Sequence, residues 1–326
     1  MLKKLLLIAL SCQLHTIAFT QEANRNSIVF SNDGILFACT YESGAVEVHD
    51  ITTGKKVFNI AGKKKYEFAD HVNSLSFSPD KKYFAIASVY QLTKVIDLST
   101  GKEIGTLDPA QKVLFTGTGK IITVKEKQLT IYSSAGCVKE KTIVLPDIVS
   151  DDANPCTVDA ISDKVIVPLF YSDYAIVDAA NGDVLSTHKE NTKGKLRSIQ
   201  VSNDARAVIT CSDSVLKIFS ISTDALRFKL AITCPGYTVP RACLTQTDML
   251  YTGSLDGENI RCIDIRTGLL SEQESMNFTS NYRMRGIYFA PRLSTCAMSH
   301  SAPYKKKATF SFLDVVTRKS TRIFLE

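Results

Sequence analysis

Several cationic side chains stand at or just before the starts of predicted strands, where they could hold a carboxylate or a phosphorylated ligand. They are His71, Lys112, Arg197, Arg241, Arg283 and Arg285. Catalysis would also require a positioned nucleophile, a metal, or a paired acid and base. The sequence contains no GxSxG, HExxH, phosphate-binding glycine loop or calcium loop. These residues therefore indicate anion binding before they indicate a reaction.

Two basic triplets, each beside a tyrosine, form a second candidate site. One comprises Lys63, Lys64 and Lys65 with Tyr66, and the other comprises Lys305, Lys306 and Lys307 with Tyr304. If the fold brings the triplets together, they create a positive patch for an anionic partner. Solvated lysines that keep the protein soluble are the other interpretation.

Loop aromatics and acidic residues supply further candidates. Tyr237, Phe278 and Tyr282 lie in predicted loops, where exposed rings can anchor a partner or fold down as caps on the core. Asp147, Asp151 and Asp152 form an acidic stretch that favours a solvated loop over a cation site. The five histidines are scattered and CxxC is absent, so we expect no metal site and no cofactor.

The elements that position these residues follow from a repeated phrase. Seven times, a β-branched run leads to an acidic or hydroxyl residue and then a turn. The anchoring residues are Asp50, Asp97, Ser133, Asp178, Ser220, Asp264 and Asp314, at intervals of 47, 36, 45, 42, 44 and 50 residues. A period that averages 44 residues indicates a repeated supersecondary unit, because no single helix or strand has that length.

Each phrase has the chemistry of a hairpin corner. Glycine follows four residues after Asp50, Asp97 and Asp178, and glycine accepts a positive φ without a Cβ clash. The preceding carboxylate or hydroxyl can accept hydrogen bonds from the backbone N–H groups of the turn. Each phrase should therefore end one strand and begin the next.

The residues around each phrase complete a four-stranded unit. In the second unit, we expect strands over 72–77, 83–87, 94–98 and 102–107, with a turn at 78–81. Seven such units account for nearly all of residues 21–326. The sequence thus predicts an all-β, single-domain protein of seven four-stranded antiparallel sheets.

Residues 1–20 have a different character. Lys3 and Lys4 precede the apolar run from Leu5 to Leu10, and Ala18 ends the segment near polar Gln21. This order predicts a signal peptide and an exported protein, periplasmic or extracellular, which does not span the membrane. Lipoprotein processing at Cys12 is the alternative. Cleavage near Gln21 would lower the net charge from +6 to +4, too little for a nucleic-acid-binding domain.

Eight cysteines follow the predicted cleavage site. Cys39, Cys211 and Cys296 lie in the second strands of well-separated units, and Cys262 lies just before an anchor. Their spacing favours buried free thiols. The pair considered for a disulfide is Cys234 with Cys243.

The stretch DHVNSLSFSPDKKYFAIAS, from Asp70 to Ser88, resembles the opening of a WD repeat, with His71 at the family's histidine. The anchors stand at the family's Trp-Asp pair, although this chain has no tryptophan; the Trp position holds His49, Ile96, Tyr132, Val177, Phe219, Ile263 and Leu313. The resemblance, to WD-repeat or YVTN-type β-propellers, covers Ser27 to the C-terminus and implies a seven-bladed β-propeller. Too little chain precedes Ser27 to donate a strand to the last sheet, so we expect closure by packing of unit one against unit seven.

A propeller implies that blade connections and strand 2–strand 3 loops share one face, where both basic triplets would lie. We therefore expect a monomeric, non-catalytic platform that binds a protein or an anionic envelope component. The alternative is a propeller enzyme of the lactonase or quinone-dependent dehydrogenase type, with the cationic residues at its channel mouth.

Overall fold

The computed structural model of the chain is all-β in the residues that it describes. These are residues 28–40, 44–61, 72–145, 159–161, 163–169, 173–189, 196–202, 204, 206–212, 215–231, 241–244, 249–253, 261–265, 267, 270–271, 283–289, 295–301, 308–314 and 320–324. The predicted signal peptide lies outside these ranges.

Twenty-eight strands are found in the described residues. The first four sheets are formed by β1 (Ile28–Phe30), β2 (Leu36–Thr40), β3 (Val46–Asp50), β4 (Lys56–Ile60), β5 (Ser74–Phe77), β6 (Tyr83–Ala87), β7 (Thr93–Asp97), β8 (Lys102–Leu107), β9 (Lys112–Phe115), β10 (Ile121–Lys125), β11 (Gln128–Tyr132), β12 (Lys139–Val144), β13 (Asp159–Ile161), β14 (Lys164–Pro168), β15 (Tyr174–Asp178) and β16 (Asp183–His188). The others are formed by β17 (Leu196–Val201), β18 (Ala207–Ser212), β19 (Val215–Ser220), β20 (Leu226–Ala231), β21 (Arg241–Leu244), β22 (Met249–Gly253), β23 (Arg261–Asp264), β24 (Leu270–Ser271), β25 (Arg283–Phe289), β26 (Thr295–Ser301), β27 (Ala308–Asp314) and β28 (Ser320–Phe324).

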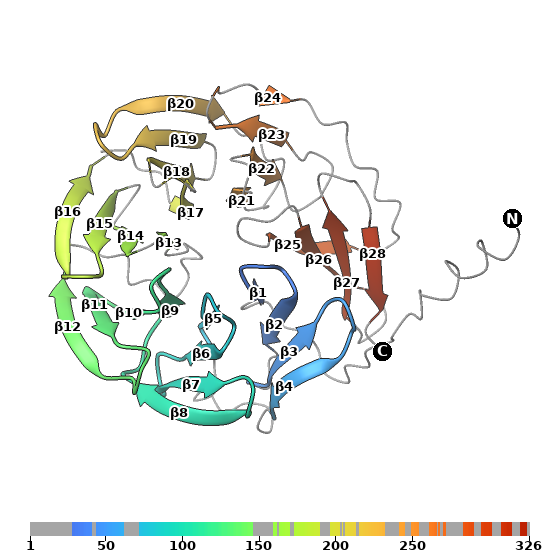
Figure 1. Cartoon of the computed structure of the whole chain (residues 1–326). Helices are drawn as coiled ribbons and strands as arrows, with labels where there is room; N and C mark the ends of the chain where they lie inside the picture. Colours follow the sequence, from blue (N-terminus) through green and yellow to red (C-terminus); the bar gives the residue numbers. More distant parts are fainter. Residues whose placement is uncertain are drawn as a thin grey trace, which may run out of the picture.

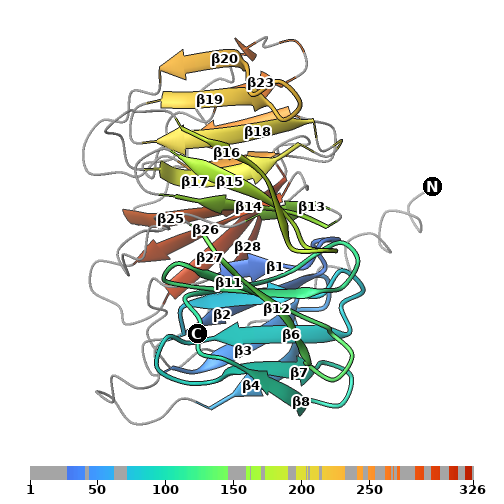
Figure 2. The same cartoon turned by 90° about the vertical axis from the view of Figure 1, so that its left-hand side faces the viewer.

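These strands form seven antiparallel sheets, each of four consecutive strands. The sheets stand around a common axis as blades of a β-propeller, with the first strand of each sheet innermost and the fourth on the rim (Figure 1). The sheet that begins with β1 lies beside the sheet that begins with β25 in both views (Figures 1 and 2). No described strand crosses between sheets. The predicted four-stranded propeller is therefore confirmed.

The hairpin corners form as the repeated phrase predicts. Oδ1 of Asp50 accepts hydrogen bonds from the backbone N–H groups of Thr52 (2.8 Å) and Thr53 (2.9 Å), and Gly54 takes a φ of 66°. Asp97 makes the same contacts with Ser99 (2.8 Å) and Thr100 (3.2 Å). Each carboxylate satisfies donors that the turn would otherwise leave exposed.

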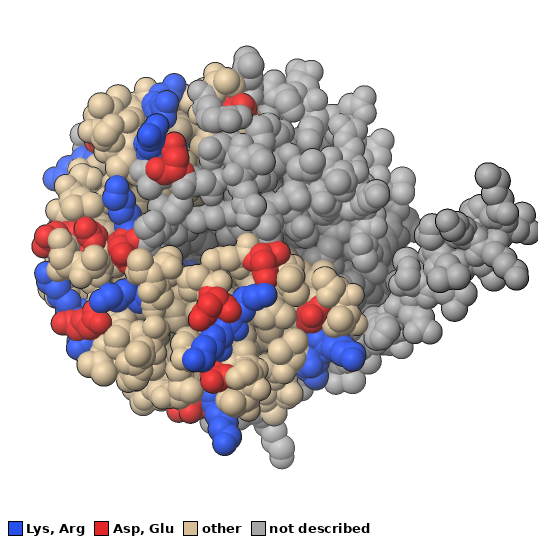
Figure 3. Space-filling view, in the orientation of Figure 1, with Lys and Arg blue, Asp and Glu red and all other residues tan. Residues whose placement is uncertain are grey.

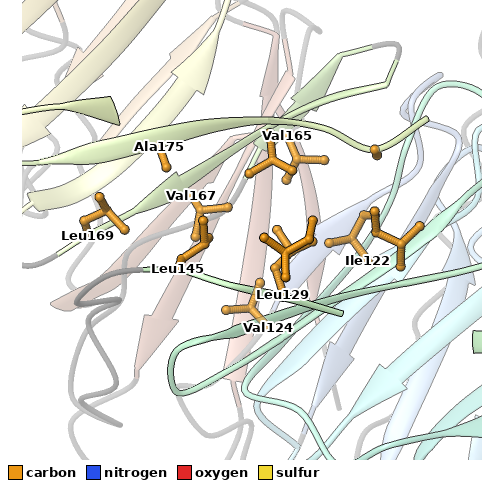
Figure 4. Packing of buried hydrophobic residues seen from close by; sticks show 12 residues of the cluster. Ile122, Val124, Leu129, Leu145, Val165, Val167, Leu169 and Ala175 are labelled. Atoms are coloured by element: carbon orange, nitrogen blue, oxygen red, sulfur yellow. The ribbon is translucent and has the colours of Figure 1, made fainter. Parts of the chain in front are cut away.

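The hydrophobic core lies at the seams between consecutive sheets. In β6, Phe84 and Ile86 pack toward the first sheet, whereas Ala85 and Ala87 pack toward the third. Both faces of a middle strand are therefore buried, which explains its near-continuous apolar run. Figure 4 shows one seam, where Leu129 of the third sheet packs near Val165 of the fourth.

The residues at the Trp position are buried in every blade where the structure describes their side chains. They are His49, Ile96, Tyr132, Val177, Phe219 and Ile263, each less than 5% exposed. In five of these blades, the residue packs against the preceding sheet: Ile96, Tyr132, Val177, Phe219 and Ile263 belong to successive seam clusters. Tryptophan is dispensable because this position requires a buried side chain of suitable volume.

Candidate functional site

The antiparallel order separates two faces of the ring. One face carries the strand 1–strand 2 turns and the strand 3–strand 4 corners. Turns of adjacent blades contact each other on this face: Nζ of Lys81 lies 2.5 Å from Oδ2 of Asp33, and the hydroxyl of Thr118 donates to Asp163. The opposite face carries the blade connections and the strand 2–strand 3 hairpins, and is the face on which the sequence places its candidates.

All residues of the predicted partner-binding site lie outside the described residues. These are Lys63, Lys64, Lys65, Tyr66, Tyr237, Phe278, Tyr282, Tyr304, Lys305, Lys306 and Lys307, together with His71 and the acidic residues Asp147, Asp151 and Asp152. The first and seventh sheets are neighbours in Figure 1, as convergence of the two triplets requires. The convergence itself stays a prediction.

The predicted channel-mouth cations map to innermost strands. Three of them are the first residues of innermost strands: Lys112 of β9, Arg241 of β21 and Arg283 of β25. The pairing register of β17 skips Arg197, and that of β25 skips Arg285. A skipped residue marks a β-bulge, which changes the direction of the chain locally. The anion site formed by the four arginines stays a prediction, because the structure describes only their backbone.

On the face that carries the strand 2–strand 3 hairpins, the described residues include a candidate site that sequence reasoning missed. The hairpin from Ser88 to Leu92 joins β6 to β7, and the side chains of Tyr90 and Leu92 are 62% and 53% exposed. Large apolar side chains exposed close together in the sequence are candidates for an interaction surface. The signal in the sequence was the short stretch SVYQL, which places two apolar residues in a turn where polar residues are usual.

Hydrogen bonds fix the backbone of this hairpin. The N–H of Val89 donates to Oδ1 of Asn73 (2.9 Å), and the N–H of Ala110 donates to the carbonyl of Ser88 (2.8 Å). The hairpin is thus tied to the segment before β5 and to the connection into the third blade. A tyrosine on a fixed backbone binds at a lower entropic cost than one on a mobile loop.

The connection beside the hairpin is fixed through Asp108. Its Oδ2 accepts hydrogen bonds from the hydroxyl of Tyr132 (2.9 Å) and the ammonium of Lys139 (3.0 Å). The hydrogen bond from Lys139 has the larger effect and the one from Tyr132 the next, and together they hold the pKa of Asp108 below its usual value. Burial, reinforced by the hydrogen bond to Asp108, raises the pKa of Tyr132 to about 12. The carboxylate therefore stays ionised and the phenol stays neutral at physiological pH.

The same connection reaches the next hairpin, which turns at Glu126 and Lys127. The N–H of Glu126 donates to Oε1 of Gln111 (2.9 Å), so residues 108–111 bridge two hairpins. We call residues 88–92, 108–111 and 125–127 the Tyr90 surface. It combines exposed apolar groups with charges of both signs. Figure 3 shows the opposite face, which carries the strand 1–strand 2 turns; acidic and basic side chains alternate over its described part, without an extended area of one sign.

A polar cluster lies at the seam between the fourth and fifth sheets. The ring of His188 stacks on Tyr174, with centroids 4.7 Å apart, and packs on Phe219 at 4.4 Å. Its Nδ1 lies 2.6 Å from Oδ1 of Asp224. Burial, followed by the Asp224 charge, raises the pKa of Tyr174. Because the Nε2 atom of His188 is also buried, this His-Asp pair has no nitrogen to offer a substrate.

The cysteines follow the prediction where their side chains are described. Cys39 and Cys211 are buried and Cys137 is half-buried, and none of the three forms a disulfide. The side chains of Cys234, Cys243, Cys262 and Cys296 lie outside the described residues. Within the described ranges, no three metal-binding side chains come together, and no helix could cross a bilayer.

The fold and the Tyr90 surface together define the class of protein, a β-propeller with an exposed hairpin on one face. Residues 62–97 match the family model described as WD domain, G-beta repeat. The WD repeat-containing protein 1 of Bos taurus and that of Rattus norvegicus are each 29% identical to this chain over 89 residues. The match spans 27% of this chain and 14% of those proteins.

Solved structures extend the likeness to most of the chain. The β-propeller domain of Myceliophteria thermophila Cps50 (Swd1) matches with a TM-score of 0.65 and 15% identity, covering 91% of this chain and 97% of that domain. The C-terminal WD40 domain of Sif2 matches with a TM-score of 0.64 and 12% identity, covering 85% of this chain and 78% of that one. One repeat of the chain is thus similar in sequence to WD repeats, and the described strands share the β-propeller fold of these structures.

Proposed function

We propose that this protein is a non-catalytic interaction platform that binds a protein partner through the Tyr90 surface. WD-type propellers typically act as such platforms, which supports the general role. The observation that carries the specific site is the exposure of Tyr90 and Leu92 on a hairpin whose backbone is held at its start, at Ser88 and Val89. Tyrosine is enriched among the residues that dominate interface energies.

The partner should present an apolar group together with charges of both signs. Asp108 and Lys139 form an ion pair beside the connection, and Lys125 and Glu126 belong to the neighbouring hairpin. A complementary partner would place an apolar side chain on Tyr90 and polar groups around it. If the two lysine triplets also face this partner, they would add a salt-dependent contribution from a second region of the same face.

Site-specific photo-crosslinking tests this proposal. A photoreactive residue at position 90 should capture a discrete partner in the native host. The same residue at position 104, on the rim of the same blade, should not. Replacing Tyr90 and Leu92 together by Ser should weaken capture from a second binding-face position without lowering the melting temperature, because both side chains are exposed. Equal capture at positions 90 and 104 would contradict the site.

The proposed location is outside the cytoplasm. The order of Lys3, Lys4, apolar run and small residue supports cleavage close to Gln21. N-terminal sequencing of protein from the native host should begin near that residue. A lipid-modified Cys12 would support the lipoprotein alternative, and an intact Met1 in a cytoplasmic fraction would refute export.

A further inference from the structure

The fifth sheet carries two lysines directly opposite each other on its two outer strands. The register of β19 with β20 pairs Lys217 with Lys229. Because side chains alternate along a strand, Lys217 lies on the same face as Phe219, which packs into the seam with the fourth sheet. Phe228 and Leu230 pack into the other seam, so Lys229 also lies on the face toward the fourth sheet. Both ammonium groups therefore extend from the same face, near the rim on which Figure 1 places β20.

This arrangement carries an electrostatic cost. Like charges at opposed positions of an antiparallel pair destabilise a sheet. Burial lowers the pKa of Lys217, and the charge of Lys229 lowers it further. The corresponding outer-strand residues of the first four sheets are short and neutral: Asn59, Thr106, Thr142 and Thr187. The fold therefore does not require a lysine at position 229.

The first two sheets balance a charge at the equivalent position of the third strand. Glu47 contacts Lys56 at 2.7 Å, and Lys94 contacts Glu103 at 3.3 Å. Lys56 and Glu103 are the outer-strand residues opposite the Trp position, and the residue with this register in the fifth sheet is Leu226. The place that supplies an opposite charge in those two sheets is thus apolar in the fifth.

A third cation borders the same seam. Lys189 is exposed and directly follows His188, the last residue of β16. The ring of His188 packs on Phe219, with centroids 4.4 Å apart, and Phe219 lies two residues after Lys217 in β19. The carboxylate of Asp224, at the corner before β20, already lies 2.6 Å from Nδ1 of His188. The outer end of the seam therefore receives cations from both sheets.

We propose that Lys217 and Lys229 form a binding site for a phosphate group, as free phosphate or as a phosphate ester. A phosphate monoester carries a charge of about −1.5 to −2 at pH 7 and has three strong acceptor oxygens. One such group can accept a hydrogen bond from each ammonium and offset both charges, whereas a carboxylate offsets only one. The site lies on the outer strands, separate from the Tyr90 surface, and does not depend on the function proposed for that surface.

NMR titration of the full chain with inorganic phosphate and with methyl phosphate tests the proposal. At ionic strength matched with chloride, the side-chain signals of Lys217 and Lys229 should shift together and saturate, and the pKa of Lys217 should rise. Saturation with both probes, or with inorganic phosphate alone, would support a site for free phosphate. Saturation with methyl phosphate alone would support a site for an ester. Shifts that match those in chloride would overturn the proposal.

Two variants and a matched control test the residues. Lys229→Thr copies the residue of the second, third and fourth sheets and should weaken phosphate binding about tenfold, because a charge-assisted hydrogen bond is lost. Leu226→Glu copies the charge of Glu103 and should block the site with a carboxylate from the chain itself. The control Lys94→Thr, at the equivalent position of the second sheet, should bind phosphate like the unchanged protein.

Melting temperatures without phosphate separate lost binding from lost folding. Lys229→Thr and Leu226→Glu should melt no lower than the unchanged protein, because each relieves the repulsion between the two lysines and Leu226 is 50% exposed. Phosphate binding that survives both substitutions, or that is lost equally in Lys94→Thr, would refute the assignment of the site to this pair.

Discussion

The Nδ1 atom of His188 lies 2.6 Å from the Oδ1 atom of Asp224, joining the end of one outer strand to the hairpin corner of the next sheet. Because a carboxylate only accepts hydrogen bonds, Nδ1 carries the proton in this pair. Register places Ile60, Leu107, Ile143 and Leu230 at the equivalent position of the first, second, third and fifth sheets. Histidine is therefore the polar exception among these five blades.

Replacing His188 by Leu should raise the free energy of unfolding by about 1 kcal/mol. Leucine occupies the equivalent site in two other blades, and the change removes a buried Nε2 atom that has no hydrogen-bond partner among the described residues. Asp224 can be solvated after the change because its side chain is 55% exposed. Urea unfolding measures the difference.

The control is His188→Ala, which should lower the free energy of unfolding by about 2–4 kcal/mol, because it removes ring packing and leaves a cavity. A His188→Leu variant that loses as much stability as His188→Ala would show that the hydrogen bond to Asp224 dominates the seam.

Gly105 and Cys137 should be energetically coupled. A Cβ atom on Gly105 would lie 2.7 Å from the Sγ atom of Cys137, which occupies the adjacent blade's corner with a φ of 55°. Gly105→Ala should therefore cost about 1–3 kcal/mol through overpacking. Adding Cys137→Gly should recover most of that loss, because it removes both the clash and a left-handed non-glycine residue.

A double-mutant cycle by denaturant unfolding measures this coupling. Independent, additive effects of the two substitutions would contradict the contact between these blades.

Stability should fall on acidification below about pH 4. The bond from Lys139, followed by that from Tyr132, lowers the pKa of Asp108, and hydrogen bonds from Ser99 and Thr100 lower that of Asp97. Each folded-state pKa lies below its unfolded value. Between these two pKa values the unfolded chain binds more protons than the folded protein. The stabilisation is therefore complete at pH values above the unfolded-state pKa, and it is lost as the pH falls through the folded-state pKa.

Melting temperatures between pH 6 and pH 2.5 check this dependence. Asp108→Asn should make the acid branch shallower, because one linked carboxylate has been removed. An acid branch that keeps its slope in this variant would show that Asp108 does not contribute to the linkage.

The sequence determined the repeat, the corners and most strands of this protein, because these depend on local chemistry. Asp50 and Gly54 specify a hairpin corner through bonds within five residues. The predicted strands 83–87 and 102–107 coincide with β6 and β8. The repeat could be predicted although the chain has no tryptophan, because the anchor pattern persists without it.

Only the tertiary structure decided which residues meet across the seams and which remain exposed. His188 and Asp224 are 36 residues apart, and Tyr132 and Asp108 are 24 apart, so no local pattern pairs them. The exposure of Tyr90 and Leu92 likewise depends on how Asn73 and Ala110 hold their hairpin. Contacts between blades arise from the closed ring. There the packing of whole sheets sets the distances between side chains of neighbouring blades, and the repeat length in the sequence does not encode these distances.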